Sequence, residues 1–155
     1  MKGPALYQQE WQEKEIKIPA SSLEDFSGEN YVYSVKWLGF TVGEVKFHNL
    51  GLEEYKGRKI YRITVIAKTN KLIRYLFRVE DEVNSYIDAE TLKPVVLKVK
   101  RRERNYRTDY ETYFDYENNK IIHIASLKGE RKKADLPLDA YGIISCFYKF
   151  RTLDF

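Results

Sequence analysis

The sequence predicts a mainly β domain, an antiparallel meander of six or seven strands with one C-terminal helix. Apolar and polar residues alternate with a period of two in segment after segment from residue 30 to residue 127. This period is typical of strands with one face on a core. The segments are short and turn signals separate them, which favours antiparallel pairing because parallel neighbours need long crossover connections.

The alternating segments predict the strands in order. They cover residues 31–37, 44–48, 61–68, 79–87, 95–104, 106–116 and 121–127. Turn residues lie between them at Lys56-Gly57, Asp88 to Pro94, Arg104-Asn105 and Asn118-Asn119. Residues 70–77 have helical spacing and predict a short helix or turn, and Gly129 to Lys133 predicts a charged loop. Gly39 and Gly43 are expected at bends or at positive φ.

The C-terminal helix is expected near residues 139–152. Asp139 is a candidate N-cap, and the apolar residues that follow recur at helical spacing up to Arg151. The residues expected to cover the sheet are Ile143, Ile144, Phe147 and Phe150, with Lys149 on the outer side.

Length and charge limit the class of protein. A chain of 155 residues fits one domain, which we place at residues 29–155 after a lead-in segment at residues 1–28. Charged residues make up 32% of the chain, and its longest apolar run, at residues 141–148, is too short to span a bilayer. The net charge of +4 arises from one basic stretch between Lys98 and Arg107, so a nucleic-acid partner is not expected. The N-terminus lacks the apolar stretch of a secretory signal.

No constellation of residues predicts catalysis or metal binding, so neither an enzyme activity nor a cofactor is expected. His48 and His123 have no acid beside them in sequence, and Cys146 stands alone. Glu80 and Glu82 share a strand face at a separation that glycosidases use, but an exposed acidic face explains them as well.

Several segments after residue 28 resemble one bacterial family. They are YSVKWLGFTVGEVKF (33–47), YRITVIAKT (61–69), DEVNSYIDAETLKPVV (81–96), YRTDYETYFDYENNKI (106–121) and DAYGIISCFYKFRTLDF (139–155). They resemble the bacterial domain-of-unknown-function family 3108. The resemblance implies an exported protein of the periplasm or outer envelope. It also implies a curved sheet, a half-barrel or β-roll similar to lipoprotein carriers, with no assigned activity. The family pattern continues into further strands after the helix, so the chain is expected to lack the C-terminal part of the domain.

Two classes of function follow from these expectations. The first is a non-enzymatic module that binds a lipid or other hydrophobic ligand on a concave sheet. Its expected ligand-binding residues are Trp37, Phe47, Tyr61, Tyr110, Phe114 and Phe147. The second is a structural or protein-interaction module of the envelope with a filled core, whose protein partner the sequence does not identify. The Tyr and Thr residues from 106 to 116 suit either class, as a cleft wall or as ordinary core.

The basic hairpin is a second candidate site. Its residues Lys100, Arg101, Arg102 and Arg104 are expected to face outward with no acid beyond Glu103 beside them in sequence, and therefore to bind an anionic membrane surface. A solvated hairpin tip is the alternative.

Overall fold

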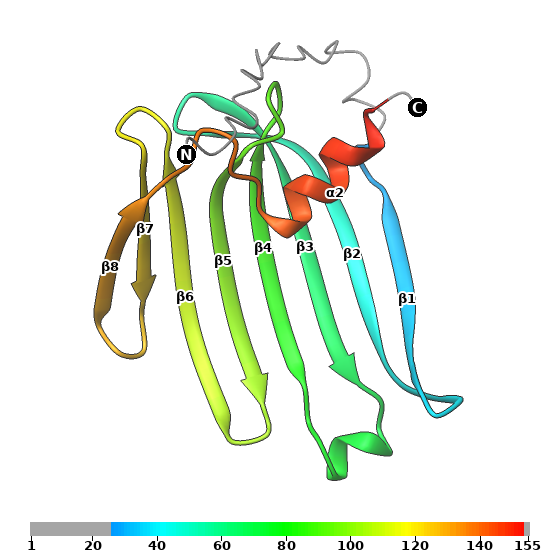
Figure 1. The fold of residues 1–155 in the computed structure, drawn as a ribbon. Helices are drawn as coiled ribbons and strands as arrows, with labels where there is room; N and C mark the ends of the chain where they lie inside the picture. Colours follow the sequence, from blue (N-terminus) through cyan, green and yellow to red (C-terminus); the bar gives the residue numbers. More distant parts are fainter. Residues whose placement is uncertain (1–25, 154–155) are drawn as a thin grey trace, which may run out of the picture.

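A computed structural model describes residues 26–153 and confirms the antiparallel meander with one C-terminal helix (Figure 1). Eight strands form one open sheet in which each strand pairs with its neighbours in sequence. They are β1 (Asn30–Trp37), β2 (Phe40–Tyr55), β3 (Arg58–Thr69), β4 (Glu80–Asp88), β5 (Pro94–Glu103), β6 (Tyr106–Asp115), β7 (Lys120–Ala125) and β8 (Glu130–Asp135). A 3-10 turn, η1 (Ile73–Tyr75), joins β3 to β4, and helix α2 (Ile143–Arg151) follows β8.

The register places alternating apolar residues of β2, β3 and β4 on one face. Phe47 pairs with Val65 of β3, and Val65 pairs with Val83 of β4. Because side chains on directly paired residues point to the same side, these apolar sets form one surface. Helix α2 lies against this surface, which we call the helix face, and the other side is the opposite face.

The core lies between α2 and the middle strands. Ile144 and Tyr148 of the helix pack on Tyr61, Ile63 and Ile87 of the helix face. Phe26 closes the cluster, with its ring centroid 5.5 Å from that of Tyr148. The end of the segment expected to be a lead-in is therefore part of the core, while residues 1–25 lie outside the described residues.

Strand β8 corrects the prediction of a charged loop at Gly129 to Lys133. Its six residues, ERKKAD, are all exposed and show no apolar alternation. Backbone hydrogen bonding to β7 forms the strand, with Ile122 paired to Lys133 and Ile124 to Arg131. A charged edge strand discourages pairing with further strands, so its sequence resembles that of a solvated loop.

Helix α2 is capped three residues later than expected. Its N-cap is Gly142 rather than Asp139, and its buried residues are Ile144, Ser145 and Tyr148. The prediction that Ile143 and Phe150 cover the sheet is wrong, because these side chains are 89% and 61% exposed. Residues four apart lie one above the other on a helix, so Ile144 and Tyr148 define the buried stripe.

Turns lie at the expected positions Lys56-Gly57, Arg104-Asn105 and Asn118-Asn119. Gly57 and Asn119 have positive φ, which their residue types tolerate, whereas the positive φ of Lys56 and Arg104 was not indicated by the sequence. Gly39 has a φ of 84°, as expected. The described residues contain no helix that is long and apolar enough to cross a membrane.

Candidate functional site

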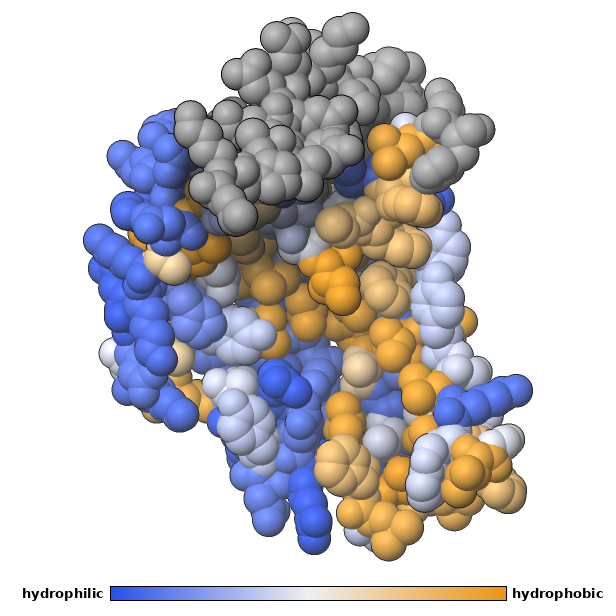
Figure 2. Space-filling view, viewed as in Figure 1, coloured by the Kyte–Doolittle hydropathy of each residue, from blue (hydrophilic) through white to orange (hydrophobic). Residues whose placement is uncertain are grey.

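Helix α2 covers only one end of the helix face. In Figure 1 it crosses β2 to β4 near the end of the sheet that holds the β2–β3 and β4–β5 turns. Figure 2 shows the apolar surface continuing from the helix towards the far ends of β1 and β2. Along β1, Tyr33, Val35 and Trp37 point to this face and are 48%, 43% and 68% exposed. The uncovered part of the helix face is therefore an apolar surface open to ligands.

A row of aromatic rings connects this surface to the helix. The ring centroid of Phe47 on β2 lies 5.7 Å from that of Tyr33 and 6.0 Å from that of Phe147 on α2. Phe147 remains 37% exposed. We call Tyr33, Phe47 and Phe147 the aromatic row. It offers ring faces and edges against which an apolar chain can pack.

An arginine at the end of α2 closes the upper end of the row. Arg151 forms two hydrogen bonds to the carboxylate of Glu29, at 2.6 and 2.7 Å. Its guanidinium also lies 4.5 Å from the ring centre of Phe26 and 5.7 Å from that of Phe147. The hydrogen bonds from Arg151 lower the pKa of Glu29. Sequence reasoning missed this pair because 122 residues separate the partners and neither lies in a motif.

The six residues expected to bind a ligand do not form one site. Phe47 and Phe147 are together in the aromatic row. Tyr61 is only 3% exposed and is part of the core under α2. Trp37 lies at the turn between β1 and β2. Tyr110 and Phe114 lie on the more distant β6, where Tyr110 packs on His123 with ring centroids 4.9 Å apart.

A hollow lies on the opposite face of the sheet. Its volume is about 640 Å³, within the range of small-molecule pockets. The turn between β2 and β3 brings Tyr55 to this hollow, beside Tyr113 of β6 and Ile122 of β7. Lys56, Arg58 and Arg131 also line it. Sequence reasoning missed the hollow because the bend of the hairpin creates it rather than any local pattern.

Tyr113 in this hollow is held by a carboxylate. Its hydroxyl donates a hydrogen bond to Glu111, two residues away on the same face of β6. This bond and burial raise the pKa of Tyr113 to about 12, while the same bond lowers the pKa of Glu111. The hollow therefore combines apolar side chains with a tyrosine hydroxyl that a carboxylate holds in place.

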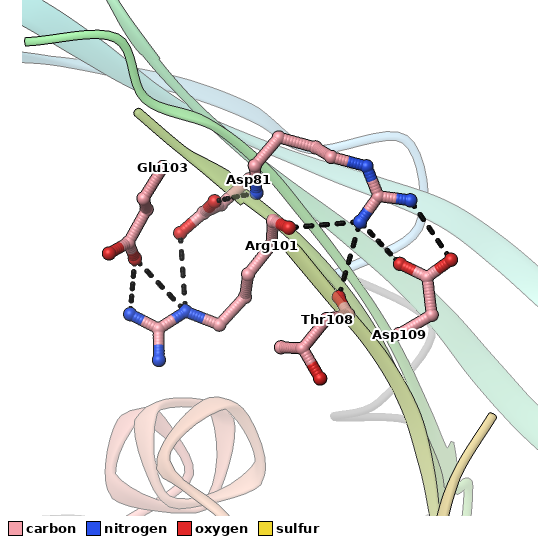
Figure 3. A network of polar contacts seen from close by, with 6 residues as sticks. Asp81, Arg101, Glu103, Thr108 and Asp109 are labelled. Carbon is pink, nitrogen blue, oxygen red and sulfur yellow. Dashed lines mark hydrogen bonds and ion pairs between the residues drawn. The ribbon is translucent and has the colours of Figure 1, made fainter. Parts of the chain in front are cut away.

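The basic hairpin contains an ion-pair network (Figure 3). Arg101 contacts both Glu103 and Asp81, and Arg102 pairs with Asp109. The expectation that these arginines lack acidic neighbours is therefore wrong for Arg101 and Arg102. Adjacent residues on a strand point to opposite faces, so the two guanidinium groups project to opposite sides of the sheet.

The side chains of this network also have shifted pKa values. The hydrogen bonds from Arg102 lower the pKa of Asp109, whereas burial raises the pKa of Asp81. Asp81 accepts a hydrogen bond of 2.9 Å from the backbone N–H of Arg102, which ties β4 to β5. Lys100 and Arg104 are exposed and have no ion pair within the described residues.

The remaining titratable candidates have structural partners. Arg74 and Arg78 pair with Glu80 and lower its pKa, the opposite of what a glycosidase acid requires. His48 lies 2.6 Å from the Asn30 side-chain oxygen, and His123 lies 3.0 Å from the Thr112 hydroxyl. Within residues 26–153, no three His, Cys, Asp or Glu side chains are grouped to hold a metal ion.

Comparison with known protein families matches most of the chain. A family model described as "Protein of unknown function (DUF3108)" matches residues 32–154, which include the whole sheet apart from the first residues of β1, and α2. No curated protein and no solved structure matches the chain.

Proposed function

The chain belongs to the family described as protein of unknown function DUF3108, and we propose that it is a non-enzymatic bacterial envelope protein that binds a lipid or other hydrophobic molecule. The binding surface is the uncovered part of the helix face, and the ligand packs along the aromatic row. The envelope location, in the periplasm or outer envelope, rests on the family resemblance described above. The binding role rests on the geometry of the helix face.

The observation that carries the proposal is the width of the uncovered apolar surface. On the helix face of β1, β2 and β3, the side chains that the register brings together are uncharged from Tyr31 to Ala67. Tyr33, Val35 and Trp37 are 43% to 68% exposed on this surface. A contiguous exposed apolar area of this kind marks a binding surface in soluble proteins.

An acyl chain suits this surface better than a polar ligand does. Removing each CH₂ of the chain from water contributes about 0.8 kcal/mol, so a chain lying along several strands gains affinity without any directed hydrogen bond. The rings of the aromatic row stand at successive positions from β1 to α2, with centroid spacings of 5.7 and 6.0 Å. The row therefore gives an extended chain a track from the open sheet to the helix.

The first test is saturable binding of an environment-sensitive fluorescent fatty acid to the folded chain. Phe47→Ala and Phe147→Ala should each weaken probe binding by about tenfold, since each removes an aromatic contact worth roughly 1 kcal/mol or more. Each variant is also examined by far-UV circular dichroism, because Phe47 is half-buried. A probe that binds the folded chain with no saturation contradicts the proposal.

A matched variant on the opposite face locates the site. Tyr113→Ala enlarges the 640 Å³ hollow without touching the aromatic row. We expect this variant to bind the probe as the parent chain does. If Tyr113→Ala weakens binding and Phe47→Ala does not, the ligand occupies the opposite face and the proposed site is wrong.

Strand pairing at β1 is a second candidate function. Within the described residues, the outer edge of β1 has no neighbouring strand, and the exposed residues of this strand include Val32 at 61%. Unlike the charged β8, this edge is apolar and suited to adding a strand from a partner. Native mass spectrometry distinguishes the two: a dimer or a co-purified peptide favours pairing, and a bound lipid mass favours the carrier role.

A further inference from the structure

Three turns meet at the end of the sheet away from α2. They join β1 to β2, β3 to β4, and β5 to β6, and they form the lower rim of the sheet in Figure 1. Backbone hydrogen bonds connect them: the Asn70 N–H donates to the Val42 carbonyl at 2.9 Å, and the Arg104 N–H donates to the Arg78 carbonyl at 2.7 Å. The three turns are therefore one continuous edge, which we call the lower edge (residues 36–41, 70–81 and 101–107).

The lower edge presents large apolar side chains to solvent. In the first turn, Leu38 and Phe40 are 77% and 76% exposed, and in the second, Leu72 and Leu76 are 80% and 76% exposed. The side chains of Trp37, Tyr75 and Phe77 are also exposed. Turn tips are normally polar, so seven such residues on two adjacent tips need a reason beyond folding.

Basic residues surround these apolar tips. The lower edge contains eight basic and three acidic residues, a net charge of +5, which exceeds the +4 of the whole chain. The three acids, Glu80, Asp81 and Glu103, are all paired with arginines. The cations left without an ion pair among the described residues are Lys36, Lys71, Arg104 and Arg107. The free charge of the edge is therefore positive.

We propose that the lower edge docks the protein on an anionic lipid bilayer. The exposed Leu, Phe and Trp side chains of the first two turns enter the interface between head groups and acyl chains. The free lysines and arginines contact the lipid phosphates beside them. Apolar insertion together with basic contacts is the combination by which proteins bind membrane surfaces without spanning them. This role does not rest on ligand binding, although the two surfaces share Trp37, and it would place the open helix face beside a source of acyl chains.

The test is co-sedimentation of the chain with phosphatidylcholine vesicles that do or do not contain phosphatidylglycerol. We expect binding to the anionic vesicles, weakened by salt because exposed charges are screened. Leu72→Ser with Leu76→Ser, and separately Lys71→Gln, Arg104→Gln and Arg107→Gln together, should each reduce vesicle binding by about tenfold or more. These side chains are exposed, so the variants should keep the melting temperature of the parent.

Matched controls lie at the other end of the sheet. Leu138→Ser removes an apolar side chain that is 65% exposed, and Lys56→Gln, Arg58→Gln and Lys59→Gln together remove three cations of the β2–β3 turn. Both should bind vesicles as the parent does. If they reduce binding as much as the lower-edge variants, the attraction is general and the assigned edge is wrong.

Trp37 reports insertion directly. In a Trp11→Phe background it is the single tryptophan of the chain, and its emission should shift to the blue on anionic vesicles and be quenched by lipids brominated in their acyl chains. An unchanged spectrum with vesicles bound contradicts insertion. Absence of vesicle binding at low salt overturns the proposal, and a dimer lost in the Leu72→Ser, Leu76→Ser variant would assign the edge to a second copy of the chain instead. Fatty-acid binding without vesicle binding would leave the ligand site intact, so the two proposals can fail separately.

Discussion

At the residue scale, Arg151, the last residue of α2, ties the helix to the beginning of the described chain. It binds the carboxylate of Glu29 through two nitrogens and lies within 4.5 to 5.7 Å of four aromatic ring centres. A planar guanidinium makes both kinds of contact at once, and a lysine cannot reproduce them. The Arg151–Glu29 pair therefore holds the segment before β1 against the last turn of α2.

Arg151→Gln should lower the free energy of unfolding by about 1–2 kcal/mol at pH 7, as expected when a charged hydrogen bond is lost. The pKa of Glu29 is lowered from its ordinary value of 4.5 in the folded chain, so the unfolded chain binds more protons just below that pH. The contribution of the pair is therefore present above pH 4.5 and is lost as the pH falls through the folded pKa. Urea unfolding of the parent and the variant between about pH 3 and pH 7 measures this loss. A difference in stability that stays constant over the range would contradict the role of the pair.

Gly43 is a second position where one residue decides the local structure. A Cβ there would lie 2.5 Å from the carbonyl oxygen of Lys68, a backbone atom of β3 that cannot move aside. It also lies next to the register shift between β1 and β2. The sequence indicated a bend at both Gly39 and Gly43, but the two glycines are needed for different reasons, positive φ in one case and close approach in the other.

Gly43→Ala should therefore lower the free energy of unfolding by roughly 2 kcal/mol or more, since overpacked sites cost about 1–3 kcal/mol. Gly39 has a φ of 84°, but no atom lies within 4 Å of a Cβ added there. The cost of Gly39→Ala should therefore be limited to backbone strain of about 1 kcal/mol. Thermal unfolding of the two variants gives the comparison. Equal losses in both would show that the close approach to Lys68 is unimportant.

At the element scale, the two isoleucines that open α2 test which face of the helix is buried. Ile144 is 6% exposed and Ile143 is 89% exposed. Ile144→Ala should cost about 2–4 kcal/mol of unfolding free energy through lost burial and a cavity, and Ile143→Ala less than about 0.5 kcal/mol. Urea unfolding followed by circular dichroism measures both. Similar losses in both variants would instead support the expectation from the sequence that both isoleucines cover the sheet, and would contradict the orientation of α2 described above.

The strands that pack on the core could be predicted because packing leaves its mark as alternation. Tyr61, Ile63 and Val65 alternate with polar residues because one face meets α2. Strand β8 could not be predicted from the sequence, because none of its side chains is buried and only its backbone hydrogen bonds define it. The start of α2 was missed because Gly142 provides the cap with no side-chain hydrogen bond to reveal it.

The candidate sites were predictable only in part. Phe47 and Phe147 could be named from the aromatic pattern, but their adjacency depends on the tilt of α2, which no local signal contains. The pairing of Arg102 with Asp109 could have been predicted from the hairpin at Arg104-Asn105. This hairpin places Asp109 opposite Lys100, and Arg102 points to the same face as Lys100, two residues along the strand. The hollow at Tyr55 and Tyr113 requires the bend of a long hairpin and lay beyond sequence reasoning.

At the scale of the whole molecule, the sheet divides its surface by chemistry. The helix face is apolar from α2 to the ends of β1 and β2, the opposite face is charged around its hollow, and the lower edge joins apolar tips to free cations. A meander produces this division naturally, because its turns alternate between two ends and its side chains between two faces. The binding role we propose belongs to the apolar face, and the docking role belongs to the edge.

The most direct test of the binding role is photo-crosslinking of the full chain with a fatty acid that carries a diazirine on its acyl chain, followed by peptide mapping. We expect saturable crosslinks in residues 31–47 of β1 and β2 and in residues 143–150 of α2, and we expect unlabelled fatty acid to compete with them. Crosslinks confined to the peptides of Tyr55, Tyr113 and Ile122, or labelling that neither saturates nor is competed, would contradict it.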